Sequence, residues 1–252
     1  MDIKIIVAAH KPYWMPSDSV YIPIHVGATD KKSIGFQGDN NGDNISFKNK
    51  NYCELTGLYW AWKNIDAEYI GLVHYRRHFA NGRLFCKKQD RVIGGAQLEE
   101  LLRSNDLILP KPRNYWIESN YSQYCHAHHA ADLDTTRQIL AEDYPAYLDA
   151  WDRIMKKTTG HRFNMFIMKK TLLDQYCAWL FDILFKLEKR LDISGYSDND
   201  ARVFGFVSER LLDIWIETNH LRYCNNPYVF MENQNWFVKI RNFIFRKIGI
   251  RL

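Results

Sequence analysis

The amino-acid sequence predicts an α/β fold built on a mainly parallel sheet. Two apolar runs rich in β-branched residues, at residues 3–10 and 69–77, each end abruptly in polar or charged residues. This pattern is typical of buried parallel strands that open into loops. Helical periodicity appears between and after them, at residues 54–64 and 171–191. Alternating strands and helices favour this fold class, whose ligands bind where the carboxyl ends of strands meet loops.

The other elements of the first half follow the same pattern. Residues 21–28 (YIPIHVGA) predict a second strand. Residues 29–51 are polar and rich in Gly, Asn and Asp, and we expect a long loop there that is either mobile or functional. Residues 98–106 predict a helix, and residues 107–112 (LILPKP) predict a strand that ends at its prolines.

The second half of the chain has mainly helical periodicity and contains many aromatic residues. Residues 124–157 predict two helices that are interrupted near Pro145, and residues 161–170 (HRFNMFIMKK) predict a strand. Residues 197–219 predict a last helix, whose acidic start suits the positive end of the helix dipole.

Positive charge is concentrated at one end of the 252-residue chain. Of 34 Lys and Arg residues, five lie within residues 236–252, which contain no acid; the other 29 equal the 29 Asp and Glu residues in number. A nucleic-acid-binding protein would spread its basic residues over the fold, so we expect no nucleic-acid partner. The five cysteines include no CxxC pair, which fits reduced thiols in a cytosolic protein.

Residues 236–252 (WFVKIRNFIFRKIGIRL) interleave apolar residues with these five cations. Such a segment can lie in the interface of an anionic membrane, so we expect the protein to be cytoplasmic and peripheral on the inner face of the plasma membrane. A last helix packed on the core, with a basic rim, is the alternative. No run of eighteen apolar residues occurs, so we expect no membrane-spanning helix.

Cationic side chains cluster at the end of the run at residues 69–77. His74, Tyr75, Arg76 and Arg77 are predicted there, and adjacent arginines can present forked donors to a phosphate or diphosphate. If the strand continues, alternation sends Arg76 and Arg77 to opposite sides, and one of them alone meets the ligand. The alternative is a charge cluster in salt bridges.

Two segments carry groups that suit a nucleotide. Small residues at the first strand end, residues 8–11 (AAHK), let a flat ring approach the backbone. Asp43, Asn44 and Asn49 offer polar groups that can read a base or a ribose. The alternative is that this cluster forms turns, which these residue types favour.

The acidic residues do not form the pattern that a divalent cation on a nucleotide diphosphate would favour. Such sites often have Asp-x-Asp directly after a strand, because Mg²⁺ and Mn²⁺ prefer carboxylate oxygens. Two Asp-x-Asp strings occur, at residues 132–134 and 198–200, and neither follows an apolar strand. We therefore expect protein cations rather than a metal ion or another cofactor to neutralise the diphosphate, with Mg²⁺ or Mn²⁺ left open.

Three carboxylates are candidates for a general base: Asp198, Asp200 and Glu209. The two aspartates have an alternative role as N-cap residues, and Glu209 has one as the ion-pair partner of Arg202 or Arg210.

A histidine cluster follows at residues 125–129 (CHAHH). His126 and His129 are three residues apart and can share a helix face. We interpret the cluster as a polar surface for an acceptor rather than as a transition-metal site, since a metal also requires a supporting shell of hydrogen bonds.

Several segments together resemble a known family. They are AAHKPYWMPSD, YIPIHVGA, GDNISFKNKNYCELTGLYWAWKN, YIGLVHYRRHF and FGFVSERLLDIWI. In this order, over about residues 3–225, they are similar to a bacterial glycosyltransferase-like domain of capsule, exopolysaccharide and O-antigen gene clusters, long known only as a domain of unknown function. The resemblance implies a GT-A-like fold, with a single Rossmann-like, mixed or mainly parallel sheet flanked by helices and a helical acceptor-side half. It also implies a galactofuranosyltransferase that uses UDP-galactofuranose and inverts the anomeric centre.

The resemblance also suggests roles for individual residues. Those expected to line the nucleotide or hold the diphosphate are Ala9, His10, Lys11, Asp43, Asn44, Asn49, His74, Tyr75, Arg76 and Arg77. Those expected on the acceptor side are Tyr121, His126, His129, Asn164 and Arg202. Glu54 lies in a matched motif whose residues belong to the site or to the core. Glu209 and Arg210 lie in the last motif and face an acceptor or a helix partner.

We expect one transferase domain over residues 1–235, with a nucleotide-sugar half to about residue 112 and an acceptor half from about residue 113, followed by the tail at residues 236–252. The expected partners are a UDP-sugar donor, an oligosaccharide or lipid-linked glycan acceptor, and an anionic membrane surface. Two alternatives stay open: a non-catalytic nucleotide- or glycan-binding module of the same fold, and a membrane-associated scaffold of a polysaccharide assembly complex.

Overall fold

The computed structural model describes residues 1–232, so the predicted tail at residues 236–252 lies outside the described residues. The strands are β1 (Ile3–Ala9), β2 (Tyr21–His25), β3 (Gln37–Gly38), β4 (Tyr69–His74), β5 (Arg77–Phe79), β6 (Leu107–Pro110), β7 (Arg113–Asn114), β8 (Thr159–Gly160), β9 (Phe166–Lys169), β10 (Tyr223–Asn226) and β11 (Tyr228–Phe230). The helices are α1 (Asn49–Tyr52), α2 (Leu55–Asn64), α3 (Gly95–Leu102), α4 (Asn120–Ala127), α5 (Ala130–Asp143), α6 (Leu148–Lys156), α7 (Lys170–Arg190) and α8 (Val203–Thr218).

A mixed, mostly parallel sheet forms the centre of the fold, which confirms the predicted class. Within residues 1–232 it has nine strands, in the order β10-β6-β9-β4-β1-β2-β3, with β5 joining β4 to β11. Strands β1 to β4 run parallel, as do β6 and β10, whereas β9 is antiparallel to both β4 and β6. The carboxyl ends of β1, β2 and β4 therefore meet at one edge of the sheet.

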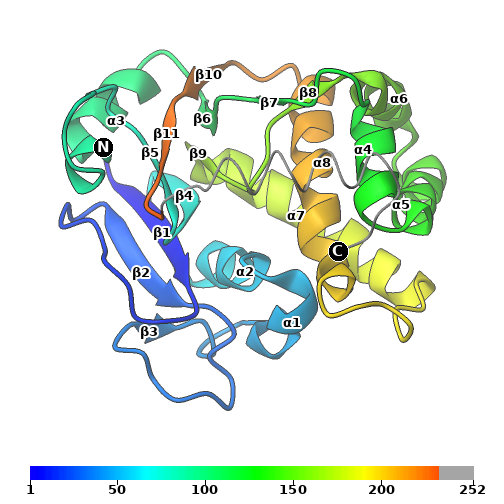
Figure 1. The fold of residues 1–252 in the computed structure, drawn as a ribbon, viewed down its shortest axis with the longest axis horizontal. Coiled ribbons are helices and arrows are strands. Elements are labelled where there is room, and N and C mark those ends of the chain that lie inside the picture. The colour runs from blue at the N-terminus through cyan, green and yellow to red at the C-terminus, as the bar shows by residue number, and fades with distance from the viewer. Residues whose placement is uncertain (233–252) are drawn as a thin grey trace.

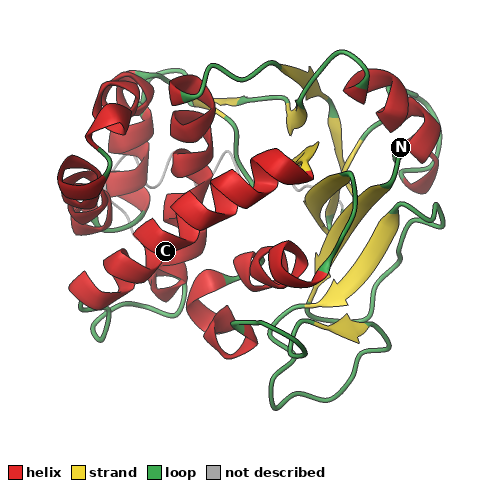
Figure 2. Cartoon of the chain, turned by 180° about the vertical axis from the view of Figure 1, so that it is seen from behind, coloured by secondary structure: helices red, strands yellow, loops and turns green. Residues whose placement is uncertain are grey.

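Helices cover both faces of this sheet. Helix α3 lies on one side, and α2 and the helices from α4 to α8 lie on the other (Figure 1). The view from behind shows the same segregation, with most helices massed on one side (Figure 2). In β1, Ile6 and Ala8 pack with the larger helical layer, and Ile5 and Val7 with the side of α3. Because both faces are buried, β1 has a continuous apolar run rather than an alternating one.

The strands predicted at residues 3–10, 21–28 and 107–112 are confirmed, as are the helices at 54–64 and 171–191. The prediction at residues 161–170 is partly wrong. Strand β9 begins at Phe166, because Phe163 and Asn164 have φ angles of 79° and 52° and interrupt an extended strand. The prediction at residues 124–157 is also partly wrong. The interruption near Pro145 is confirmed, because α5 ends at Asp143 and α6 begins at Leu148. The extended backbone of His128 also ends α4 before α5, so three helices form instead of two.

The predicted strand at residues 69–77 ends early, at His74, and a turn leads into β5, which pairs back on β4. Gly71 allows the close packing of β4 on β9, since a Cβ there would lie 2.8 Å from Cγ1 of Ile167. Strands β7 and β8, which sequence patterns miss, are two residues long and lack an apolar run. Among the helices of residues 1–232, none combines the length and apolar character needed to cross a membrane.

Candidate functional site

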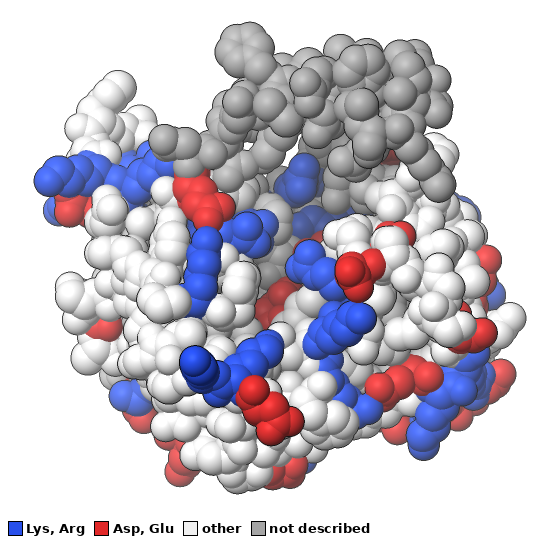
Figure 3. Space-filling model, turned by 60° about the horizontal axis from the view of Figure 1, so that its bottom comes forward, with Lys and Arg blue, Asp and Glu red and all other residues white. Residues whose placement is uncertain are grey.

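A cavity of about 920 Å³ opens at the carboxyl end of β4, between the sheet and helices α4 and α8. Basic side chains border a hollow of the face shown in Figure 3. The basic residues that line the cavity are His74, Arg76, Arg77, Arg113, His126, His128, His129, Arg162, Arg202 and Arg210. Among residues 1–232, its acidic residues are Glu54, Asp200 and Glu209. Positive charge therefore dominates its wall.

The end of β4 supplies one part of this wall, as the sequence predicted. His74 is the last residue of β4, and Arg76 and Arg77 follow it across the turn into β5. Because the chain turns here instead of continuing as a strand, both arginines reach the cavity. The alternation of side chains along a continuous strand, which would place Arg76 and Arg77 on opposite sides of the sheet, therefore does not apply here.

Several cavity arginines form no direct ion pair with a carboxylate. Within residues 1–232, Arg77, Arg113 and Arg202 have no carboxylate oxygen within 4.0 Å, and the Nε atom of Arg77 is buried without a hydrogen-bond partner. The charges of Glu54 and Glu209 act on Arg77 and Arg202 from a longer distance. Arg202 instead donates from Nε to Sγ of Cys53, at 3.1 Å. Burial raises the pKa of this thiol to about 11, so Cys53 is neutral. A group of partly buried guanidinium groups without carboxylate partners is suited to bind an anion.

His74 is a neutral donor within this cationic group. Burial, followed by the charges of Arg77 and Arg76, lowers the pKa of His74 to about 2. Its Nδ1 atom lies 3.3 Å from the backbone N–H of Arg76, which donates to it. The proton of the neutral ring is therefore on Nε2, where it can be donated to a ligand.

The loop between β8 and β9 positions two glutamates. The backbone N–H of Phe163 donates to Oε1 of Glu209 at 3.0 Å, and Nδ2 of Asn164 donates to Oε1 of Glu54 at 2.7 Å. Both loop residues have positive φ angles. Such a conformation costs a non-glycine residue about 1–3 kcal/mol and is common at functional sites. The loop therefore holds polar groups toward the cavity at the expense of backbone strain.

Asp200 and Asp198 have different surroundings. Asp200 lies 3.0 Å from Nδ1 of His128 and accepts from Oγ of Ser197 at 2.7 Å. Burial opposes the ionisation of Asp200, but these hydrogen bonds outweigh it and lower its pKa. Asp198 does not line the cavity; its side chain is 96% exposed and lies 3.4 Å from Nζ of Lys50.

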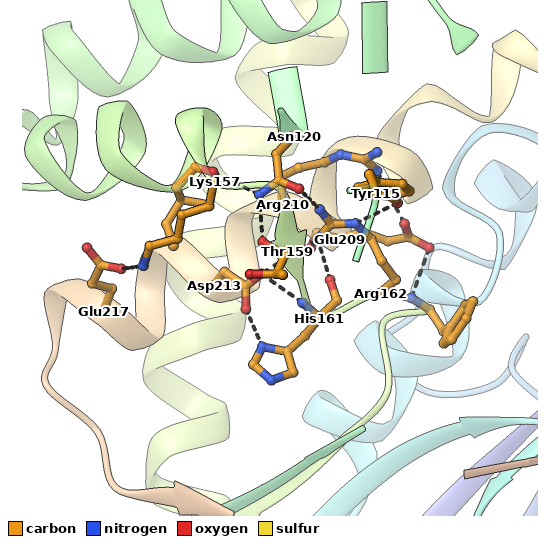
Figure 4. A network of polar contacts seen from close by, with 12 residues as sticks. Tyr115, Asn120, Lys157, Thr159, His161, Arg162, Glu209, Arg210, Asp213 and Glu217 are labelled. Carbon is orange, nitrogen blue, oxygen red and sulfur yellow. Dashed lines mark hydrogen bonds and ion pairs between the residues drawn. The ribbon is translucent and has the colours of Figure 1, made fainter. Parts of the chain in front are cut away.

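A buried polar network supports the wall behind Glu209 (Figure 4). The side chain of Arg162 is 1% exposed, and its Nη1 lies 3.6 Å from Oδ2 of Asp213. Its Nε donates to the hydroxyl of Tyr115 at 3.2 Å. Asp213 in turn lies 2.5 Å from Nδ1 of His161 and accepts the backbone N–H of the same residue. Since a buried charge needs compensation, Asp213 anchors Arg162 in the cavity wall.

The residues predicted at the end of β1 for the nucleotide, and Tyr75 of the predicted diphosphate group, lie outside this wall. Tyr75 is buried, and its hydroxyl lies 3.4 Å from Nε2 of His10. Nζ of Lys11 lies 5.5 Å from the ring centre of Tyr75, and Ala9 is buried at the end of β1. The ring centres of His10 and His74 are 6.5 Å apart, so the end of β1 adjoins the cavity without lining it.

The polar residues of the predicted loop bond within the fold. Asp43 accepts from the hydroxyl of Tyr59 at 3.2 Å. Asn44 bonds within its own turn, where it donates to the carbonyl of Gly42. Asn49 donates to the carbonyl of Cys53 at 2.7 Å. None of the three lines the cavity of the described residues, and their nucleotide role stays a prediction.

The predicted acceptor residues divide into two groups. His126, His129 and Arg202 line the cavity. Tyr121 does not, and its hydroxyl donates to Asp134 at 2.8 Å. Asn164 is 3% exposed and holds Glu54 rather than facing open space.

Sequence patterns missed Arg113 and Arg162 altogether. Arg113 lies in the two-residue β7, and Arg162 lies in a segment that the apolar pattern assigned to a strand. No local sequence pattern identifies either arginine as a site residue. Their position at the cavity depends on the pairing of strand β8 with β7.

Comparisons with known proteins identify the family and the fold of the chain. Residues 4–220 match a family model described as a domain of unknown function, DUF4422. The apo structure of WbbM, described as a bifunctional glycosyltransferase, is similar with a TM-score of 0.86 at 31% identity, over 92% of this chain and 46% of that one. The chain thus spans less than half of the WbbM chain, and no curated protein sequence matches it. Its fold is glycosyltransferase-like, and because the family model covers most of its length, the chain belongs to the DUF4422 family.

Proposed function

We propose that the protein is a glycosyltransferase that takes a sugar from a nucleotide-diphosphate donor, with UDP-galactofuranose as the first candidate. The observation that carries the proposal is the group of cavity arginines without carboxylate partners, Arg77, Arg113 and Arg202, at the carboxyl end of a central strand. The similarity to WbbM, itself described as a bifunctional glycosyltransferase, supports this choice over other enzymes that bind anions.

The chemistry follows from the charges that develop during transfer. As the bond between the sugar and the diphosphate breaks, its electron pair stays on the leaving phosphate. Guanidinium groups and the Nε2–H of His74 can stabilise this charge without having to reorganise. An acceptor hydroxyl attacks the opposite face of the sugar, and a carboxylate takes its proton, so the anomeric centre is inverted without a covalent intermediate.

We propose that these cations take the place of a divalent metal ion. Among residues 1–232, no group of three or more His, Cys, Asp or Glu side chains could hold a metal. An ion bound mainly by the phosphates would not need such a group, so the proposal rests on the unpaired arginines.

The domain division and the site of action belong to the same proposal. Residues 1–235 form the transferase domain, with the donor half before about residue 113 and the acceptor half after it. The basic and aromatic tail at residues 236–252 holds the enzyme on the inner face of the plasma membrane, where a lipid-linked glycan is the acceptor. Removal of residues 236–252 should abolish co-sedimentation with anionic vesicles and preserve transfer to a soluble acceptor. If the protein were instead a membrane-associated scaffold, removal of residues 236–252 would abolish its function.

A donor screen tests the proposed activity. The purified protein is incubated with UDP-sugars in pyranose and furanose forms and with glycan acceptors, and both UDP and product are followed by mass spectrometry. A product that carries one added sugar is the expected result. Binding of UDP by calorimetry without turnover of any donor would instead indicate the non-catalytic module.

A further inference from the structure

Three carboxylates among residues 1–232 line the cavity, and they differ in how much of each is engaged by other groups. Glu209 receives the backbone N–H of Phe163 on Oε1 and lies 3.2 Å from Nη1 of Arg210 through Oε2. Both of its oxygens are therefore occupied. Neither oxygen of Glu209 is therefore open to the hydroxyl of an acceptor.

Asp200 is occupied in the same way. Oδ1 faces His128 and Oδ2 accepts from Ser197, while Nε2 of His129 lies 3.8 Å from Oδ2. These partners lower the pKa of Asp200, as described above, and hold its carboxylate in the wall.

Glu54 keeps one oxygen available. It directly precedes α2 and lines the cavity, and Oε1 accepts from Asn164 at 2.7 Å. Within residues 1–232, no other residue donates a hydrogen bond to Oε2, and the remaining donor to this carboxylate is the backbone N–H of Glu54 itself. Burial raises the pKa of Glu54 and outweighs the hydrogen bonds from Asn164 and from its own backbone N–H, which lower it. The charge of Glu209 adds to the rise and that of Arg202 opposes it, and the raised pKa favours uptake of a proton. The charged or titratable groups that act on Glu54 are Cys53, Arg77, Arg202 and Glu209.

We propose that Glu54, rather than Asp198, Asp200 or Glu209, is the general base of the reaction. This inference rests on the proposed transferase function. The free Oε2 takes the proton of the acceptor hydroxyl as its oxygen forms the bond to the anomeric carbon. The bond from that carbon to the diphosphate oxygen breaks at the same time, and its electron pair leaves with the nucleotide diphosphate among the arginines. Asn164 is then a positioning residue, because it holds Oε1 and directs Oε2 to the cavity.

The experiment compares Glu54→Gln with Glu209→Gln and with a matched control, Glu142→Gln. Glu142 lies in α5, away from the cavity, in an exposed ion pair with Arg190. Glu54→Gln keeps the oxygen that accepts from Asn164, so the fold and UDP binding should persist. We expect its kcat to fall by roughly 100-fold or more, with the calorimetric Kd for UDP within about threefold of wild type. Glu142→Gln should match wild type.

A conservative variant and a pH profile separate a base from a structural residue. Glu54→Asp should recover part of the lost kcat, since it restores a carboxylate; it also serves as the second variant if Glu54→Gln does not fold. The wild-type kcat should rise with pH as Glu54 ionises, and this rise should be absent in Glu54→Gln. A kcat for Glu54→Gln within about fivefold of wild type would overturn the assignment and leave the transferase function intact. A wild-type protein that turns over no donor would instead overturn both.

Discussion

The guanidinium carbon of Arg77 lies 4.3 Å from the ring centre of Phe163, so the turn after β4 packs directly on the loop that precedes β9. Phe163 also donates its backbone N–H to Glu209, and its neighbour Asn164 holds Glu54. This contact joins the cationic side of the cavity to its carboxylate side. A change at Arg77 is therefore expected to act on the anion-binding side and, through Phe163, on the position of Glu209.

Removal of Arg77 should weaken UDP binding. Hydrogen bonds to charged groups contribute about 1.5–3 kcal/mol, so Arg77→Ala should raise the calorimetric Kd by roughly 10- to 100-fold. Arg77→Lys should fall between wild type and Arg77→Ala, because an ammonium group lacks the forked donors. The matched control is Arg137→Ala, which removes an exposed arginine that pairs with Asp152. Equal UDP affinities for wild type and Arg77→Ala would rule out the diphosphate role of this residue.

Turnover should persist without a divalent metal ion. If the cavity arginines neutralise the leaving diphosphate, excess EDTA should leave kcat within about twofold of its value in Mg²⁺. The measurement is UDP release after dialysis against EDTA, with Mn²⁺ and Mg²⁺ added back separately. Loss of turnover in EDTA and its recovery with Mn²⁺ would show that an ion bridges the phosphates, contrary to our proposal.

The protein should lose stability in acid partly through His74. Its pKa is lowered in the folded state, so the unfolded chain takes up a proton below pH 6.5 and the folded chain does not. The contribution of neutral His74 to the free energy of unfolding is therefore present above pH 6.5 and is lost as the pH falls below it. Buried His78, with a pKa lowered to about 4, acts in the same direction.

Between pH 7.5 and 5, His74→Gln should lose roughly 1–2 kcal/mol less free energy of unfolding than wild type, since one pKa unit corresponds to about 1.4 kcal/mol. Urea unfolding at both pH values measures this difference. His220→Gln, at an exposed histidine, should follow the wild type. Parallel pH dependence of His74→Gln and wild type would contradict a neutral, buried His74.

The network behind the cavity should be a major determinant of stability. Asp213→Ala removes the carboxylate that faces both Arg162 and His161, and it leaves the buried guanidinium of Arg162 without its carboxylate partner. Such a change costs about 3–5 kcal/mol. Asp152→Ala removes one partner of an exposed ion pair with Arg137, and should cost about 1 kcal/mol or less. Thermal unfolding of both variants measures this difference. Similar Tm values for Asp213→Ala and Asp152→Ala would show that the buried network contributes no more to stability than the exposed ion pair.

Particular residues show how far the sequence could predict the site. His74, Arg76 and Arg77 follow an apolar run without interruption, and the change from apolar to charged residues marks them as a strand end. Asp198 and Asp200 are two residues apart, and the sequence treats them alike, yet Asp200 lines the cavity and Asp198 is almost fully exposed. Their difference arises from how the segment before α8 packs, which two neighbouring positions do not encode.

The sequence by itself determined the α/β class, the strands β1, β2 and β4, and the delivery of cationic side chains to a strand end. These follow from hydrophobic periodicity and chain order, which are local properties. Only the tertiary structure decided that Arg113, Arg162 and Arg202 join Arg77 around one cavity, and that Glu54 keeps an open oxygen. Burial, the distance between groups from distant segments, and the partners that shift a pKa arise only when the elements pack together.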